Sequence, residues 1–444
     1  MGISIMPDPA YLMTMRDGTI KQINPSTGTR VWTVPGRGSR PQTQTTGETR
    51  PVSDTDWTHG CAFCSARYLE TPPEKARLIR NGDDWQTLEH VPAERLFDTV
   101  AEFRAVPNLF EIVSYNYWHD NYGYVLPAPI AAHKRAYLAS DQGRRHVCAV
   151  QGAKMRLLGT PAEDIASLEQ DQMLCHADGF FGGSHDVVIA RRHWVDGART
   201  TTDLASAGTL TPDEHEQYIR LTLHAMENLY TTNRYVRYVA AFQNWLKPAG
   251  ASFDHLHKQL VAIDEHGANA DQVLSRVREN LNFFNECGVN YASYHNLLVA
   301  ENASAIAFAG FGHRYPAIEI YSKSAKVRPW EHSSEEVRDI SDLMHAIHAA
   351  TGPDVPCNEE WHHVPVDVDV PMPWRINIKW RVSTVAGFEG DTKIYINTIS
   401  PHEVHESVTK RLYELRAAGA IADIRIADEC SGAPNPLKYN PSLW

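Results

Sequence analysis

The segment NWLKPAGASFDHLHKQ, residues 244–259, holds two histidines one residue apart, directly before the apolar run Leu260–Ile263. A short apolar run of this kind is typical of a buried strand. Because alternate residues of a strand point to the same face, His255, His257 and Gln259 are predicted to form one polar row, with the two histidines about 7 Å apart. This row is the starting point for both the fold and the function.

Such a polar row suits either a metal site or a neutral imidazole that attacks an electrophile. A polar strand face in solvent is the competing interpretation, because a chain with 22 histidines contains chance pairs. The residues before the strand favour a site. Gly250 and Ser252 suit a close approach of the backbone to a ligand, and Asn244 ends the preceding strand.

The composition is that of a soluble globular protein. The chain has 444 residues, of which 43% are hydrophobic and 22% are charged, enough for two or three packed domains. Its formal charge of -12 argues against general nucleic-acid binding, so an anionic ligand must meet a local basic site. Without a run of about 18 apolar residues or a basic and apolar leader pattern, we expect a cytoplasmic protein with no membrane partner.

Seven cysteines form an odd set for a disulfide framework, and only Cys61 and Cys64 are close in sequence. Their spacing allows both thiolates to bind one tetrahedral ion, although a redox pair is the alternative. A zinc site needs two further ligands. His255 is one candidate, and the other candidates are His193, which follows an apolar run, and its competitors His119 and His185.

Helix and strand patterns occur twice. Thr211-Pro-Asp-Glu predicts the start of a helix that ends near Thr231, followed by strands at 235–242 and 255–263 that pair with each other. A second helix is predicted to open at Ser334, with strands at 374–382 and 393–396. The second set lacks the paired histidines, so only the first is expected to carry out chemistry. Residues 120–184 look like an insertion.

At five ordered places the chain resembles the galactose-1-phosphate uridylyltransferase family of the histidine-triad superfamily, whose relatives include ADP-glucose phosphorylase and diadenosine tetraphosphate phosphorylase. The matching segments are 29–41 with Pro-Gly-Arg-Gly-Ser-Arg-Pro, 61–74 with the cysteine pair and Thr-Pro-Pro-Glu, 185–193, 244–259, and 386–397 with Gly-Phe-Glu and Ile-Asn. The resemblance covers most of the chain.

This resemblance implies an α+β fold of two histidine-triad-like halves, each an antiparallel sheet with packed helices. Residues 1–264 would form the catalytic half, interrupted by the insertion at 120–184, and residues 265–444 the sugar or acceptor half. It also implies a structural zinc ion held by Cys61, Cys64, His193 and His255, and a homodimer is a further expectation of the family.

The resemblance further implies double displacement at the α-phosphorus of a nucleotide sugar. His257 would be the nucleophile that forms a nucleotidyl-enzyme, and a hexose 1-phosphate or phosphate would be the acceptor. Asn244, Ser252 and Gln259 would donate to the α-phosphoryl oxygens. The remaining binding roles fall to Arg37 and Arg40 as phosphate clamps, Asn116 at the base or ribose, and Glu389 at the sugar hydroxyls.

Two other functions stay open from the sequence. One is phosphorolysis or hydrolysis of dinucleoside polyphosphates, which differs in whether Glu389 and the second half face a sugar or a second nucleotide. The other is a zinc-stabilised nucleotide-binding protein without turnover, against which the complete pair of His257 and Gln259 argues.

Overall fold

A single antiparallel sheet of twelve strands runs through the protein in the computed structural model, which describes residues 10–36, 49–82, 84–175 and 177–443. The strands of the two predicted halves therefore join edge to edge in one sheet instead of forming separate sheets. In spatial order the strands are β16 (Arg425–Ile426), β10 (Leu298–Glu301), β11 (Ala305–Gly310), β12 (Ala317–Ser322), β14 (Arg375–Trp380), β13 (Cys357–His362), β8 (Tyr238–Trp245), β9 (His257–Ile263), β7 (His185–Ala190), β6 (Ala101–Pro107), β4 (Ala76–Asn81) and β5 (Asp84–Glu89).

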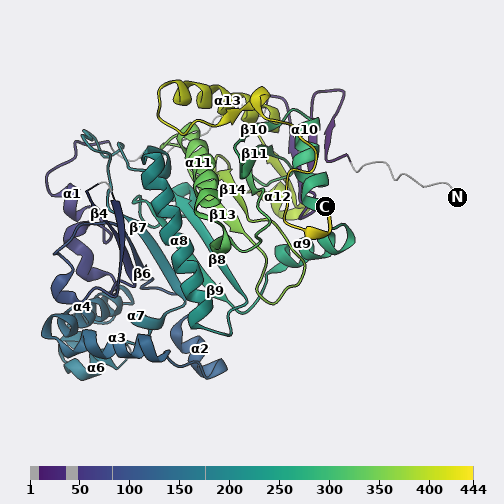
Figure 1. Cartoon of the computed structure of the whole chain (residues 1–444). Helices are drawn as coiled ribbons and strands as arrows, with labels where there is room; N and C mark the ends of the chain where they lie inside the picture. Colours follow the sequence, from purple (N-terminus) through teal and green to yellow (C-terminus); the bar gives the residue numbers. More distant parts are fainter. Residues whose placement is uncertain (1–9, 37–48, 83, 176, 444) are drawn as a thin grey trace.

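Two long helices, α8 (Pro212–Thr232) and α11 (Ser334–Thr351), lie side by side on one face of this sheet (Figure 1). Both start with a capping box. In α8 the Thr211 hydroxyl accepts from the Glu214 backbone N–H, and the Glu214 carboxylate accepts from the Thr211 N–H. The ring of His215 in α8 lies 2.7 Å from the Ser341 hydroxyl in α11, which ties the two helices together. Both predicted helices are confirmed.

The order of the strands repeats along the sheet. The series β4-β6-β7-β9-β8 has α8 between β7 and β8, and the series β10-β11-β12-β14-β13 has α11 between β12 and β13. The two series meet where β8 pairs with β13. Their registers also correspond, because His257 opens β9 opposite Ile189 of β7, and Arg375 opens β14 opposite Tyr321 of β12.

Predicted strands are found with shifted ends. The strand predicted at 235–242 is β8, which begins three residues later, and it pairs with β9 as expected. β9 begins at His257, so His255 precedes the strand instead of opening it. The strand predicted at 374–382 is the shorter β14. The ends differ because hydrogen bonding to neighbouring strands, not local sequence, sets where a strand stops.

A second, four-stranded sheet joins the two ends of the chain. Its strands are β1 (Leu12–Thr14), β2 (Ile20–Ile23), β3 (Arg30–Thr33) and β15 (Ile394–Asn397), and β15 pairs parallel with β3. This sheet packs on the second series, since the Asn24 amide donates to the Phe311 carbonyl at 3.2 Å and Gly312 N–H donates to the Gln22 side chain at 3.0 Å. The first strands in sequence thus lie with the second half in space.

The predicted insertion 120–184 belongs to a longer connection between the neighbouring strands β6 and β7, and this connection forms a group of helices. Its own apolar core includes Tyr137, Val147 and Phe181. The ring of His146 contacts the Thr71 carbonyl at 2.9 Å, which attaches the group to the loop after the paired cysteines. The helices are α2 (Tyr115–Tyr122), α3 (Ala128–Ala139), α4 (Asp141–Leu157), α5 (Ala162–Ala166), α6 (Gln170–Leu174) and α7 (Gly179–Gly182).

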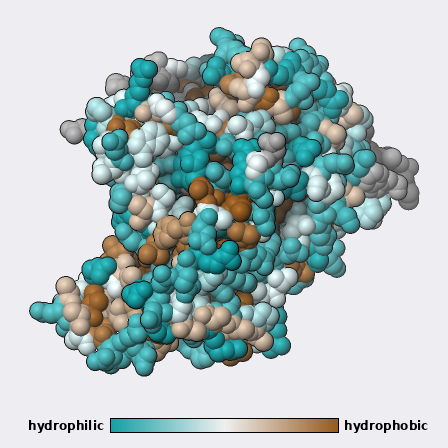
Figure 2. Space-filling model, turned by 60° about the vertical axis from the view of Figure 1, so that its left-hand side comes forward, coloured by the Kyte–Doolittle hydropathy of each residue, from teal (hydrophilic) through white to brown (hydrophobic). Residues whose placement is uncertain are grey.

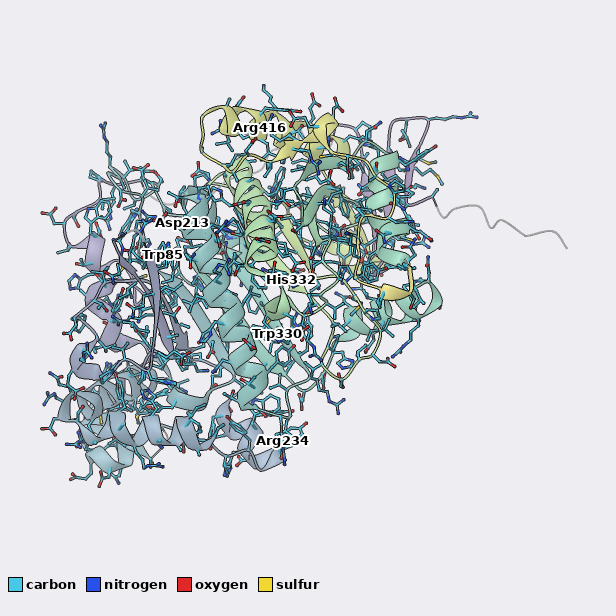
Figure 3. The ribbon with its side chains drawn as sticks, in the orientation of Figure 1. Trp85, Asp213, Arg234, Trp330, His332 and Arg416 are labelled. Atoms are coloured by element: carbon cyan, nitrogen blue, oxygen red, sulfur yellow. The ribbon has the colours of Figure 1, made fainter. Side chains whose placement is uncertain are left out.

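The remaining helices lie around the sheet, and among the described residues no helix is long and apolar enough to cross a membrane. They are α1 (Asp56–His59), α9 (Ala268–Glu279), α10 (Tyr291–Tyr294), α12 (Gly387–Thr392) and α13 (Pro401–Ala417). The first turn of α8 is held at the sheet edge by Trp85, whose indole N–H donates to Asp213 at 2.9 Å (Figure 3). The surface is mainly hydrophilic, with apolar residues gathered near the middle of one face (Figure 2).

Candidate active site and metal centre

The structure brings together the four residues that the resemblance assigned to zinc. The sulfurs of Cys61 and Cys64 are 3.9 Å apart, Cys61 Sγ lies 3.4 Å from His255 Nδ1, and Cys64 Sγ lies 3.4 Å from His193 Nδ1. All four ligand atoms lie within 4.8 Å of one another. Tetrahedral zinc with bonds of about 2.3 Å to sulfur places two sulfurs about 3.8 Å apart, so this donor set fits the ion.

Neighbouring groups aim these ligands. The Nε2–H of His255 donates to the Ala190 carbonyl at 2.6 Å, which leaves Nδ1 facing the cysteines. The ring of His193 stacks on Trp194 at 3.9 Å. The hydrogen bond from the Cys61 thiol lowers the pKa of Cys64 well below its ordinary value, as a metal-binding thiolate needs. Four protein ligands leave no open position, which is the arrangement of a structural site.

His257 lies beside this centre with one ring nitrogen engaged. Its Nδ1 lies 2.7 Å from the His255 carbonyl, and since a carbonyl only accepts, Nδ1 carries the proton and Nε2 keeps its lone pair. Within the described parts of the chain, Nε2 has no hydrogen-bond partner. Burial lowers the pKa of His257 to about 4, so the ring is neutral at pH 7. Phe63, between the two cysteines, packs edge-on against this ring at 5.1 Å.

Gln259 is oriented by His185 from the neighbouring strand. The backbone N–H of Ile112 donates to His185 Nδ1 at 3.2 Å, so the neutral ring carries its proton on Nε2. Burial lowers the pKa of His185 to about 4, which keeps it neutral. Its Nε2 lies 3.1 Å from Gln259 Oε1 and also borders the Asn108 amide. Donation to Oε1 leaves the amide N–H groups of Gln259 for a ligand.

Asn244 is oriented in the same manner, from the second half. Asn358 Nδ2 donates to Asn244 Oδ1 at 2.6 Å, which leaves the Asn244 amide N–H groups as donors. These groups lie next to Gly250, whose φ of +91° favours glycine and where an added Cβ would lie 3.9 Å from Asn244 Nδ2. Ser252 is exposed in the turn before β9. The segment therefore presents backbone and amide donors close together.

Four other binding residues were predicted from the resemblance. Arg37 and Arg40 lie outside the described residues. Asn116 is exposed in α2, and the Glu389 carboxylate accepts from the backbone N–H of Ala386 at 3.1 Å, within the first turn of its own helix. Their roles stay predictions.

Three residues of the site were not assigned a role from sequence. His185 entered only as a competing metal ligand, and its true neighbour Gln259 is 74 residues away. Phe63 is one of the two residues between the cysteines, and Asn358 belongs to no motif. Only the predicted row of His255, His257 and Gln259 indicated that this face carries function.

A family model described as a domain of unknown function, DUF4921, matches residues 15–439. The chain belongs to this family. It is also 27% identical over 183 residues to the ADP-glucose phosphorylase of Arabidopsis thaliana. The matched segment covers 38% of this chain and 50% of that protein. The match thus spans about half the length of the curated relative.

Solved structures confirm the fold. An ADP-glucose phosphorylase from Arabidopsis thaliana, crystallised with bound ADP-glucose, superposes with a TM-score of 0.58 at 19% identity and covers 88% of this chain and 98% of its own. A GalT-like protein from the same plant gives a TM-score of 0.56 at 18% identity with the same coverage. In sequence the chain is therefore similar to ADP-glucose phosphorylase, and it shares the α+β fold and large antiparallel sheet of these GalT-like structures.

Proposed function

We propose that this DUF4921 protein transfers a nucleotidyl group from a nucleotide sugar through a covalent intermediate on His257. One observation carries the proposal: the Nδ1–H of His257 is held by the His255 carbonyl, and its neutral Nε2 has no hydrogen-bond partner among the described residues. A fixed, unprotonated imidazole is the arrangement that a nitrogen nucleophile requires.

The reaction would proceed in two displacements. His257 Nε2 attacks the α-phosphorus, a P–N bond forms, and the bond from phosphorus to the bridging oxygen breaks, releasing the sugar phosphate. An oxygen of the acceptor phosphate then attacks the same phosphorus and the P–N bond breaks, which regenerates the imidazole. A phosphate leaving group has a second pKa of about 6, so it needs little help from a general acid.

The surroundings of His257 support this chemistry. Positive charge develops on the ring as the P–N bond forms, and the His255 carbonyl faces the proton that would carry it. Cys61, Cys64, His193 and His255 would hold a zinc ion that fixes the position of this carbonyl. The metal would therefore aim the nucleophile without touching the substrate.

Amide donors would neutralise the α-phosphoryl oxygens. Gln259 and Asn244 each have their carbonyl oxygen engaged and their N–H groups available, and we assign Ser252 to the same group. By resemblance, Arg37 and Arg40 would bind the phosphates, Asn116 the base or ribose, and Glu389 the sugar hydroxyls. A preorganised set of donors costs no rearrangement during the reaction.

We interpret the two strand series as two histidine-triad-like halves. Their identical strand order and corresponding registers support this interpretation. Only the first half carries the His-x-His pair, since the second has Pro373 and Arg375 at the matching positions. The homodimer expected from the resemblance stays a prediction.

ADP-glucose is the first donor to test, with phosphate as acceptor, because the curated relative is an ADP-glucose phosphorylase. The assay follows release of ADP and glucose 1-phosphate. We expect turnover by the wild type, a loss of about a thousandfold or more in His257→Ala, and no change in His402→Ala, an exposed histidine on α13. Turnover of a dinucleoside polyphosphate alone would identify the alternative substrate, and full activity of His257→Ala would refute the mechanism.

A further inference from the structure

A cavity of about 830 Å³ lies beside the first site, and neither His257 nor Gln259 lines it. It is bounded by strands β8, β13 and β14, the loop after β11, the start of α9 and the turn between β2 and β3. Glu360 of its wall pairs in register with Phe242, which in turn pairs with Gln259, so the cavity opens on the same face of the sheet as the first site.

The cavity lining is basic although the whole chain carries a formal charge of -12. Arginine and lysine outnumber the carboxylates in it by four to two. The cations are Arg314, Arg375, Lys379 and Arg381, and the carboxylates are Glu319 and Glu360. A concave basic surface on an acidic protein indicates an anionic ligand.

Both carboxylates of the lining are already engaged by other groups. Glu319 lies 2.8 Å from the His313 ring and accepts from the Tyr321 hydroxyl at 2.7 Å. Glu360 is paired with Lys379 at 2.6 Å. Among the residues that the structure describes, no carboxylate forms an ion pair with Arg375, although Glu319 contributes to the field around it.

Arg375 is a buried cation that stacks on the Phe284 ring at 4.3 Å and borders the Tyr321 ring, with no ion pair among the described residues. Its side chain is part of a residue only 6% exposed, and its Nε is buried without a hydrogen-bond partner. The Nε of Arg381, next to the same cavity, is also buried and unpartnered. Ring stacking gives a guanidinium no hydrogen-bond acceptor for its planar donors, and a phosphate group matches those donors.

Asn377 supplies a complementary group. It is two residues from Arg375 on β14 and therefore points to the same side, and it is also only 6% exposed. Its Oδ1 has no partner, while its Nδ2 lies 3.3 Å from the His362 ring. The Asn377 oxygen lacks a hydrogen-bond partner and lies beside the Arg375 guanidinium, which forms no ion pair among the described residues. This combination suits a ligand that carries both a hydroxyl and a phosphate.

We propose that this cavity is a second binding site for a phosphorylated sugar, either free or as part of a nucleotide. Arg375 binds its phosphate, and Asn377 accepts from a sugar hydroxyl. Arg375 and Asn377 occupy in β14 the register that His257 and Gln259 occupy in β9, so this half keeps polar recognition and lacks a nucleophile. The site binds without catalysis, and counting it as a second binding event rests on the function proposed for the His257 site.

The test is isothermal titration of the full chain, in the His257→Ala background, with glucose 1-phosphate and separately with AMP. We expect two binding events per chain for at least one probe, and Arg375→Gln to weaken one of them about tenfold or more because a charge-assisted bond is lost. Arg278→Gln, which removes an exposed charge from α9, should leave both events unchanged.

Asn377→Asp keeps the side-chain shape and adds a negative charge, so it should weaken the same event even where Arg375→Gln lowers the melting temperature. Preference for glucose 1-phosphate or AMP would tell a free sugar phosphate from a nucleotide. Unchanged affinity and stoichiometry in Arg375→Gln and Asn377→Asp, with folded protein in both, would overturn the proposal.

Discussion

Asn358 of β13 donates from Nδ2 to Oδ1 of Asn244 in β8 at 2.6 Å, across the line where the two halves of the sheet meet. Two neighbouring groups fix the orientation of the Asn358 amide, because one can only accept a hydrogen bond and the other can only donate one. Its Nδ2 also donates to the Ala249 carbonyl at 2.8 Å, and its Oδ1 accepts from the Arg381 guanidinium at 2.7 Å. Asn358 thereby engages the oxygen of the Asn244 amide and leaves its N–H groups as the end available to a ligand.

This contact predicts that, of two substitutions at Asn358, the one closer in shape to asparagine lowers activity more. Asn358→Ala leaves the Asn244 amide free to rotate, whereas Asn358→Asp offers only acceptors and turns the Asn244 oxygen toward the phosphate. We expect kcat to fall about tenfold in Asn358→Ala and further in Asn358→Asp, although aspartate is the closer match in shape. Steady-state kinetics with separate kcat and KM values test this. An aspartate variant that rescues the alanine variant would contradict it.

Metal content should separate the two histidines of the pair. His255→Ala removes a ligand from a closed site, so zinc per chain and the melting temperature should both fall. His257→Ala should retain zinc, because its ring bonds only to the His255 carbonyl. Inductively coupled plasma mass spectrometry of both purified variants gives the answer, and undiminished zinc in His255→Ala would remove it from the ligand set.

His185 should act on the reaction only through Gln259. We expect His185→Ala to slow formation of the nucleotidyl-enzyme about 10-fold to 100-fold with unchanged zinc content, since Gln259 loses the partner of its Oε1. The double variant His185→Ala/Gln259→Ala should then be no slower than Gln259→Ala alone. Pre-steady-state kinetics measure these rates, and multiplicative effects of the two substitutions would show that His185 acts independently.

The stability of the fold should rise with pH between about 4 and 6.5, in part because of His345. Burial lowers the pKa of His345 to about 4, and its Nε2 lies 2.7 Å from the Leu210 carbonyl. In this window the unfolded chain binds a proton that the folded chain excludes, so stability is lost as the pH falls. One such histidine contributes a slope of up to about 1.4 kcal/mol per pH unit.

The variant His345→Gln keeps a donor for the Leu210 carbonyl and removes the titration. Urea unfolding at pH 4.5, 5.5 and 6.5 should therefore show a shallower slope for this variant than for the wild type. The exposed control His402→Gln should keep the wild-type slope. Parallel slopes in all three proteins would show that His345 does not contribute.

Features that depend on residues close together in the chain could be predicted from the sequence. The capping box of Thr211 and Glu214 is complete within four residues, and the spacing of Cys61 and Cys64 already limits how they bind an ion. His193 as the third zinc ligand came from the resemblance. Contacts such as Asn358 to Asn244 span 114 residues and depend on which strands become neighbours. No local pattern fixes that choice.

The boundary between the halves shows the same limit. A division at residue 264 follows the repeated order of helices and strands, but β3 pairs with β15 more than 350 residues later, as the register of Arg30 opposite Ile394 shows. No turn in the sequence indicates a parallel pair of this kind.

The covalent intermediate on His257 is tested most directly by the intact mass of the protein after mixing with ADP-glucose and a panel of other nucleoside diphosphate sugars, without acceptor, at mildly alkaline pH. We predict an added nucleoside monophosphate that is absent in His257→Ala and is removed from the wild type by phosphate. An adduct that persists in zinc-bound, folded His257→Ala would contradict the account.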